Sequence, residues 1–321
     1  MVKMYNLGID LGGTNIAAAV VDENYKIVGS ASDKTGCPAP AETIADNMCR
    51  VALAAVKDAG LKIDDINEVG VGSPGSVNPE KGEICYSANL GFANTKLGKM
   101  LEDRLGKRVF LENDANAAAY GEMIAGAGKG TKDFIAITLG TGVGGGVIMD
   151  GKMLTGSNFA GGELGHIVIV KGGAHCSCGR DGCWEAYASA TGLIRETREA
   201  MQKDKQSKMW EIAGGSLDNV NGRTAFQGKK LGDETAKRVV KEYCDYVACG
   251  LTNIINIFQP DMVCIGGGIS KEGEILAAPV REYVERERFS KNVDKQTIIK
   301  TAQLGNNAGI IGAAFIGDLY R

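Results

Sequence analysis

The chain has 321 residues, of which 44% are hydrophobic and 23% charged, and its net charge is -3. This balance is typical of a soluble globular protein long enough for two domains. The lack of a basic field argues against nucleic-acid binding. No stretch reaches the roughly 20 apolar residues of a membrane span, and no export signal is visible. We therefore expect a cytoplasmic protein with neither nucleic-acid nor membrane partners.

A repeated pattern begins at the first apolar segment. Residues 7–22 read LGIDLGGTNIAAAVVD, and residues 135–150 read IAITLGTGVGGGVIMD, which align without a gap at an offset of 128. Each predicts a β-hairpin whose glycine-rich tip has the size of a phosphate group. The repetition indicates a duplicated domain with a cleft between its halves. Chance similarity of two glycine-rich segments is the alternative interpretation.

The intervals between these hairpins carry helical and strand patterns. Helices are predicted at 41–59, 115–126 and 233–258, the last ending before Pro260. Strands are predicted at 68–72, 108–112, 134–139, 145–149 and 262–266. This alternation indicates an α/β fold in both halves. The polar stretch 203–230 gives no clear pattern.

The first tip offers groups suited to phosphate and a cation. Its backbone N–H groups can form an anion-binding concavity, and its carboxylate can hold Mg²⁺. The residues concerned are Asp10, Gly12, Gly13, Thr14 and Asn15. The sequence matches neither a Walker A loop nor a Rossmann fingerprint, because an apolar strand follows it. An ordinary glycine-rich turn is the alternative.

The second tip favours phosphate binding, because two such loops can grip a nucleotide triphosphate from both sides. Its candidate residues are Thr138, which aligns with Asp10, and Gly140, Thr141 and Gly142 within the loop 139–146. A third glycine run, Gly266-Gly267-Gly268, follows the apolar strand DMVCI. It either leaves a flat surface for adenine or ribose or forms a tight strand-to-helix turn.

A carboxylate is predicted at the end of a strand in the segment VFLEND. Asp114 and its neighbours Glu112 and Asn113 stand where a strand gives way to an alanine-rich helix. A general base is often needed at such a cleft-facing strand end. The alternative is a plain N-cap. Asn113 and Asp114 cannot both be the N-cap, so one of the two side chains is expected to be free for another role.

Three cysteines and a histidine have the spacing of a zinc site. His166, Cys176, Cys178 and Cys183 form a Cys₃His set, which predicts a closed, structural, tetrahedral zinc site. His175 adjoins a ligand and is expected to be a bystander. The other six cysteines are scattered and are expected to be reduced thiols.

Two acidic residues flank these zinc ligands. Glu163 and Glu185 are natural acceptors for sugar hydroxyls, because carboxylates form charge-assisted hydrogen bonds with them. The alternative is that both are solvated surface acids.

These motifs together resemble the ROK family (repressor, open reading frame, kinase), and within it the bacterial ATP-dependent glucokinases. The resemblance covers nearly the whole chain and rests on DLGGTN, GVGSPG, ENDANAAAYGE, LGTGVGGGVIMDG, GGELGH, CSCGRDGCWEAYAS and IGGGIS. It implies the actin-like, ribonuclease-H-like ATPase fold. The expected lobes are residues 1–117, joined by a C-terminal helix 306–321, and residues 118–305.

The resemblance also implies roles for single residues. Asp114 would be the catalytic base, and the metal ligands would hold zinc. Contacts to the sugar would come from Gly75, Asn89, Asn113, Glu163, His166 and Glu185. The two tips and Gly266, Gly267 and Gly268 would bind ATP and Mg²⁺. Family kinases are commonly homodimers or homotetramers.

The expected reaction is in-line phosphoryl transfer from ATP to a hexose, with glucose as the first candidate and a place in glycolysis. One departure concerns the sugar: the family often has Asn-Leu-x-Trp, whereas this chain has Asn89-Leu90-Gly91-Phe92. N-acetylmannosamine, N-acetylglucosamine, fructose and allose therefore stay open as substrates. A ROK repressor is disfavoured, because the first loop begins at residue 10 and leaves no room for a helix-turn-helix ahead of it. A sugar-binding protein without turnover is disfavoured by the intact Asp114.

Overall fold

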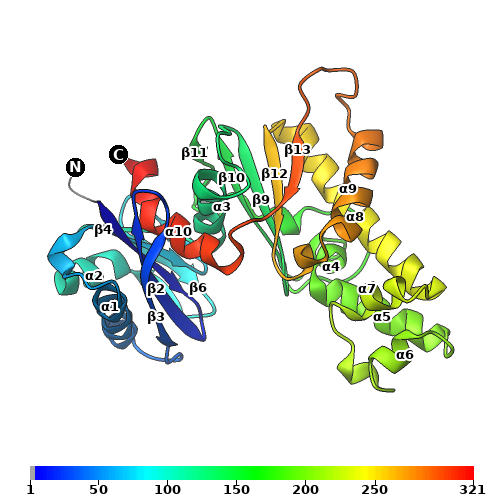
Figure 1. The fold of residues 1–321 in the computed structure, drawn as a ribbon, viewed down its shortest axis with the longest axis horizontal. Coiled ribbons are helices and arrows are strands. Elements are labelled where there is room, and N and C mark those ends of the chain that lie inside the picture. Colours follow the sequence, from blue (N-terminus) through cyan, green and yellow to red (C-terminus); the bar gives the residue numbers. More distant parts are fainter. Residues whose placement is uncertain (1–3) are drawn as a thin grey trace. The chain divides into compact units, whose positions relative to one another are not determined.

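The computed structural model describes residues 4–321, which divide into two compact units (Figure 1). The first unit contains residues 4–136, 146–162 and 303–321, and the second contains residues 137–145 and 163–302. Both units combine helices with strands, as the sequence predicted. Across residues 4–321, no helix is both long and apolar enough to cross a membrane.

The first unit is built on a five-stranded sheet with the order β3-β2-β1-β4-β8. Strands β1 and β2 are antiparallel on either side of the first glycine-rich tip, and β4 lies parallel to both β1 and β8. Its strands are β1 (Tyr5–Leu11), β2 (Asn15–Asp22), β3 (Ile27–Lys34), β4 (Ile66–Ser73) and β8 (Val109–Asn113). A smaller sheet contains β5 (Ser76–Asn78), β6 (Glu83–Ser87) and β7 (Phe92–Thr95). The helices of this unit are α1 (Ala41–Asp58), α2 (Leu97–Leu105), α3 (Asp114–Ala125) and α10 (Ala308–Phe315), followed by the short η6 (Ile316–Tyr320).

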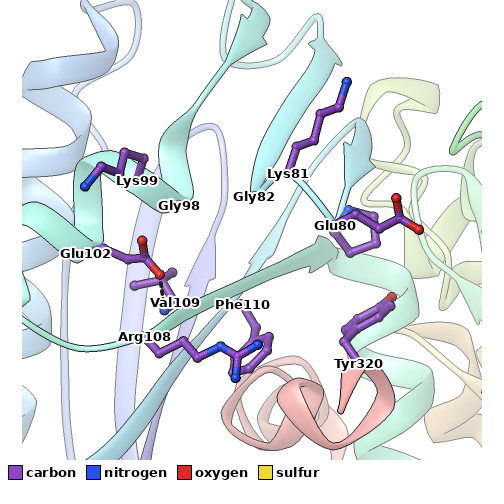
Figure 2. Close-up of a pocket in the computed structure, with 11 residues that line it drawn as sticks. Glu80, Lys81, Gly82, Gly98, Lys99, Glu102, Arg108, Val109, Phe110 and Tyr320 are labelled. Atoms are coloured by element: carbon purple, nitrogen blue, oxygen red, sulfur yellow. Dashed lines mark hydrogen bonds between the residues drawn. The ribbon is translucent and has the colours of Figure 1, made fainter.

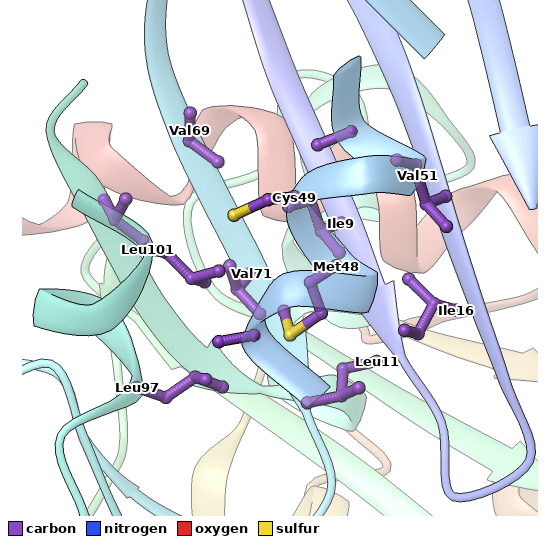
Figure 3. Close-up of a cluster of buried hydrophobic side chains, with 14 of the residues drawn as sticks. Ile9, Leu11, Ile16, Met48, Cys49, Val51, Val69, Val71, Leu97 and Leu101 are labelled. Atoms are coloured by element: carbon purple, nitrogen blue, oxygen red, sulfur yellow. The ribbon is translucent and has the colours of Figure 1, made fainter. Parts of the chain in front are cut away.

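Residues alternate between the two faces of this sheet, as the pleat requires. Ile9 and Leu11 of β1 are fully buried in a cluster with residues of α1 and α2 (Figure 3). Gly8 directly precedes Ile9 in sequence, and a Cβ atom there would come within 2.1 Å of the carbonyl oxygen of Ile310 in α10. Gly70 of β4 is similarly close to α10. The glycines therefore let α10 pack directly against the strand backbones.

The second sheet repeats the order of the first. Its strands run β11-β10-β9-β12-β13, so that in both sheets the order is third, second, first, fourth and fifth along the chain. They are β9 (Phe134–Leu139), β10 (Val143–Met149), β11 (Lys152–Met153), β12 (Met262–Gly266) and β13 (Ile298–Thr301). The helices of the second unit are α4 (Glu185–Ala188), α5 (Ala190–Lys203), α6 (Met209–Ile212), α7 (Thr224–Lys230), α8 (Glu234–Phe258) and α9 (Glu274–Glu287). The repeated strand order confirms the duplicated α/β fold.

Helices predicted at 41–59, 115–126 and 233–258 are found as α1, α3 and α8. The stretch 203–230, which gave no clear pattern, contains the short helices α6 and α7 with η3 (Leu217–Asn219) between them. The first unit also takes in residues that the sequence analysis assigned to the second lobe. Helix α3 packs closely against α10, since a Cβ atom at Gly121 would lie 2.1 Å from the oxygen of Ala308. Residues 118–136 are therefore grouped with the first unit.

Candidate functional site

The first glycine-rich tip is held in shape by a buried threonine. The Thr35 hydroxyl donates to the oxygen of Gly12 over 2.6 Å, and the Thr35 N–H donates to the oxygen of Thr14 over 2.9 Å. At the base of the turn the Gly12 N–H donates to the Asn15 oxygen, and the Asn15 side chain accepts from Lys34. The tip is thus a fixed turn. Thr35 belongs to no recognisable motif, so sequence reasoning missed it.

Two acidic residues of the first unit, Asp10 and Asp114, both have a raised pKa. Burial, and secondly the negative charge of Asp114, raise the pKa of Asp10 to about 6. Burial also raises the pKa of Asp114, against the effect of its hydrogen bond from the Ala115 N–H. The charge of Asp114 thus acts on Asp10 in a partly buried environment, which suits both cation binding and proton acceptance.

The turn from β8 into α3 contains both candidates for the N-cap of α3, Asn113 and Asp114. The side-chain Oδ1 of Asn113 accepts the N–H groups of Ala115 and Asn116 over 2.9 and 3.1 Å, so Asn113 caps the helix. Its amide group donates to the Gly75 oxygen over 3.0 Å. Asp114 is the first helical residue, and its Oδ1 also accepts the Ala115 N–H. Asp114 is therefore not needed as the cap.

The sugar-contact candidates Gly75 and Asn89 also lie close to these groups. Gly75 has a φ of 104°, and a Cβ atom there would come within 2.2 Å of the Tyr86 oxygen, so only glycine fits. A Cβ atom on Gly13 would lie 3.5 Å from the Asn89 oxygen. The first unit thus brings Gly75, Asn89 and Asn113 near the first tip. Phe92, the departure from the family pattern, is a buried core residue.

The second tip is joined to the start of α5. Within the turn the Gly140 N–H donates to the Gly142 oxygen over 3.0 Å. The Gly140 oxygen accepts the Ala190 N–H over 2.8 Å, and the Thr191 hydroxyl donates to the Thr141 oxygen over the same distance. A Cβ atom on Gly140 would meet no heavy atom within 4 Å. The tip is therefore anchored through its oxygens while one glycine faces open space.

Glu185 ties this tip to the cysteine loop. Its Oε2 accepts the Val143 N–H over 3.0 Å and would lie 2.3 Å from a Cβ atom on Gly142. Its Oε1 accepts from the thiol of Cys176 over 3.5 Å and from the hydroxyl of Ser177 over 3.3 Å. Glu185 is therefore a bridge between two loops rather than a solvated surface acid.

The segment with His166 packs against Val143 of β10, the residue that also donates to Glu185. It forms the short η2 (Leu164–His166), and a Cβ atom on Gly165 would lie 2.2 Å from the Val143 oxygen. Glu163 precedes η2 and is exposed. The structure thus brings Glu185, His166 and the second tip together. Glu163 is the residue directly before η2, which contains His166.

The predicted metal ligands meet in one cluster. The ligand atoms of His166, Cys176, Cys178 and Cys183 all lie within 4.8 Å of one another. The His166 Nδ1–Cys176 Sγ and Cys178 Sγ–Cys183 Sγ distances are both 3.7 Å. A tetrahedral zinc with Zn–S bonds of about 2.3 Å requires ligand separations of about 3.8 Å, so the donor set fits zinc.

The surroundings of this cluster anchor it to the second unit. His175 is outside the cluster, as predicted, and its Nδ1 pairs with Asp181 over 2.9 Å. Trp184 follows the last cysteine ligand, is fully buried and donates from Nε1 to the Tyr246 oxygen over 2.8 Å. Gly250 of α8 leaves the space that the indole ring occupies. The cysteine loop is therefore fixed to α8 through one tryptophan.

The third glycine run forms a tight turn and leaves one glycine facing open space. Gly267 has a φ of 86°, and a Cβ atom there would lie 2.3 Å from the Leu139 oxygen, so this position is a tight turn against β9. A Cβ atom on Gly268 would meet no heavy atom within 4 Å, and one on Gly266 would make only ordinary contacts. The turn thus needs Gly267, while Gly268 leaves open surface.

Comparison with known proteins agrees with this architecture. The family model described as "ROK family" matches residues 6–318. This chain belongs to the ROK family. It is 38% identical to a ROK relative, the glucokinase of Thermotoga maritima, over 98% of both chains. It is also 35% identical to the glucokinase of Streptomyces coelicolor, over 98% of this chain and 97% of the relative.

A solved ROK structure shows the same fold. The ROK family glucokinase from Streptomyces griseus, crystallised in complex with glucose and AMPPNP, matches with a TM-score of 0.80 and 35% identity, covering 97% of this chain and 98% of that one. The family resemblance and the fold class predicted from the sequence are therefore confirmed.

Proposed function

We propose that this ROK protein is an ATP-dependent sugar kinase that phosphorylates glucose to glucose 6-phosphate. Full-length similarity to glucokinases supports the proposal, as does the similar structure that holds glucose and AMPPNP. The observation that carries it is the partly buried Asp114 at the start of α3, whose charge acts on Asp10 next to the tip of a hairpin that occurs twice.

Asp114 is the proposed catalytic base of the reaction. Its carboxylate accepts the proton of the attacking hydroxyl, taken to be O6, as that oxygen bonds to the γ-phosphorus of ATP. The bond from this phosphorus to the bridging oxygen breaks, and ADP leaves. Burial raises its pKa, which makes the ionised form a stronger base than an exposed aspartate. Asn113, Gly75 and Asn89 are the proposed hydroxyl partners that hold the sugar near this base.

The two tips are the proposed holders of the ATP phosphates. In the first tip, Gly12, Gly13 and Thr14 supply backbone N–H groups, and Asp10 supplies a carboxylate that suits Mg²⁺. Bound Mg²⁺ would offset negative charge on the phosphates. With a pKa of about 6, Asp10 is mostly ionised at neutral pH, as a cation ligand must be. Gly140 and Thr141 of the second tip, with Gly268, are proposed to contact the nucleotide.

Glu163 and Glu185 are the proposed acceptors of sugar hydroxyls in the second unit, and the ring N–H that zinc-bound His166 would keep is a proposed donor to the sugar. Glu185 is held by the Val143 N–H and the Ser177 hydroxyl, and His166 Nδ1 lies 3.7 Å from Cys176 Sγ within the cysteine cluster. His166, Cys176, Cys178 and Cys183 would hold a structural zinc, which keeps these loops in place. The metal has no proposed part in the chemistry.

The identity of the sugar is the part of the proposal that most needs a test. Phe92, in place of the more common tryptophan, keeps N-acetylmannosamine, N-acetylglucosamine, fructose and allose as alternatives. A coupled assay of ADP release across these sugars and glucose measures kcat/KM for each. We expect glucose to have the highest value. A higher value for another sugar would keep the kinase assignment and replace the substrate, and no ADP release with any sugar would reject the proposal.

The setting of the protein follows from the same proposal. We expect a cytoplasmic enzyme of sugar metabolism that assembles as a homodimer or homotetramer. Light scattering of the purified protein measures the assembly.

A further inference from the structure

Glu112 lies two residues before Asp114, the proposed base, but its carboxylate is engaged in other hydrogen bonds. Its side chain is buried, with 1% of its surface exposed, near the end of β8. Its Oε1 accepts the Asn113 N–H over 2.7 Å and the Asn116 side-chain amide over 3.0 Å. Its Oε2 accepts the hydroxyl of Tyr320 from η6. All three partners are donors, so the carboxylate is occupied as an acceptor.

These partners surround the residue that carries the base. Asn113 precedes Asp114 and both caps α3 and donates to Gly75. Asn116 lies in the first turn of α3. One carboxylate thus fixes the peptide group at the end of the strand and the first turn of the helix, and Asp114 lies between these two fixed points. Its own bond to Ala115 is too local to set the direction of the helix.

Tyr320 extends this arrangement to the molecular surface. It lines a cavity of about 490 Å³ in the first unit together with Arg108, Phe110 and residues of the β5–β6 turn and α2 (Figure 2). Its neighbour Arg321 is paired with the buried Glu68, so the end of η6 has a second anchor that does not involve Glu112. The tyrosine hydroxyl can therefore be removed while the other anchor remains.

We propose that Glu112 and Tyr320 are positioning residues for the kinase reaction, and that they fix the strand-to-helix turn so that Asp114 points at the sugar hydroxyl. This inference rests on the proposed function. Misplacement of a reacting group by about 1 Å can cost roughly 10²-fold in rate, so small shifts of this turn are expected to appear in kcat. The nucleotide contacts lie elsewhere, so KM for ATP is expected to stay unchanged.

The test compares four variants in the hexose assay. Tyr320→Phe is expected to lower kcat about tenfold with an unchanged KM for ATP. Arg321→Gln, the matched control, removes the adjacent anchor of η6 and is expected to lower the melting temperature with little change in kcat. Glu112→Ala is expected to lose more activity than Tyr320→Phe. Glu112→Gln should recover most of that loss, because the glutamine oxygen can accept from Asn113 and its amide can donate to Tyr320.

Three results would overturn the inference. The first is a wild-type kcat in Tyr320→Phe. The second is an equal loss of kcat in Arg321→Gln, which would show general anchoring of η6. The third is a Glu112→Gln enzyme as inactive as Asp114→Asn, which would make Glu112 a proton acceptor. Tyr320→Phe keeps the test decisive if Glu112→Ala fails to fold. An inactive wild-type protein would reject the proposed function itself before any variant is compared.

Discussion

The tip between β1 and β2 is held by hydrogen bonds from Thr35, whereas the tip between β9 and β10 is held by Glu185 and by the start of α5. The strand before the first tip carries Asp10, and the aligned position before the second carries Thr138. Asp10 interacts with the charge of Asp114, while the second tip is linked through Glu185 to the cysteine cluster.

The difference shows how a duplicated element can be divided between two tasks. The first copy carries Asp10, a proposed cation ligand, in a partly buried setting that raises its pKa. The second copy has exchanged the carboxylate for a hydroxyl and is braced from outside by a loop that fits a metal ion. Substitutions in one copy are therefore expected to affect proton and cation chemistry, and those in the other to affect loop order and ligand affinity.

The largest effect is expected from Cys178→Ser. A structural zinc can contribute about 10 kcal/mol to folding, and loss of one thiolate removes most of the affinity. We expect loss of both zinc and activity, because the brace through Glu185 depends on the cysteine loop. Metal analysis and the kinase assay measure the two quantities. Cys85→Ser, in the first unit and outside the cluster, is the control and should keep both. Fully active protein without zinc would contradict the metal prediction.

Asp114→Asn tests the proposed base, whose charge acts on Asp10 before the first tip. General-base catalysis typically contributes about 10²–10⁴-fold, and kcat should fall by that factor while sugar affinity falls less. Folding should be intact, because Asn113 provides the cap of α3. Steady-state kinetics with a melting curve provide the measurement. A well-folded variant with near-normal kcat would remove Asp114 from the chemistry.

Asp10→Asn tests the residue before the first tip, and it is expected to change stability and activity in opposite directions. The pKa of Asp10 is about 6 when folded and ordinarily 3.8, so between these pH values the native state binds more protons than the unfolded state. Stability therefore falls as pH rises through this window, by up to about 3 kcal/mol at pH 7. We expect Asp10→Asn to unfold at higher denaturant than wild type at pH 8 without Mg²⁺, to lose this advantage below pH 4, and to lack activity. A variant less stable than wild type at pH 8 would contradict this account.

Glu185→Gln tests the brace of the second tip. Hydrogen bonds to a charged group contribute about 1.5–3 kcal/mol, so KM for the sugar should rise by roughly 10- to 150-fold and KM for ATP far less. Glu163→Gln is the comparison, because Glu163 is exposed and has no corresponding contact to Val143. An unchanged sugar KM in Glu185→Gln would limit Glu185 to a structural role.

The smallest effect is expected from a pair of glycine substitutions at the second tip. Gly140→Val meets open space, so its melting temperature should match wild type while KM for ATP rises by about tenfold, or about 1.4 kcal/mol. Gly142→Val would collide with Glu185 and should lower the melting temperature. Normal ATP affinity in Gly140→Val would show that the second tip is only a structural turn.

Local patterns in the sequence predicted much of this molecule. Alternating apolar residues and glycine-rich turns gave both hairpins, and the cysteine spacing gave a ligand set that the structure brings together. Contacts between distant segments were not predictable, because no local pattern encodes them. Thr35 reaches Gly12 across the sheet, Tyr320 reaches Glu112 from the far end of the chain, and Gly8 is explained only by the helix above it.

The packing of α10 has a consequence for how the protein is made. N-terminal domains generally fold first as a chain leaves the ribosome. Here residues 303–321 complete the first unit, yet they are translated after the whole of the second. The sheet face at Gly8 and Gly70, which α10 covers, therefore stays open during synthesis. A nascent chain of this protein presents an uncovered sheet to chaperones, and the unit that starts first is the last to close.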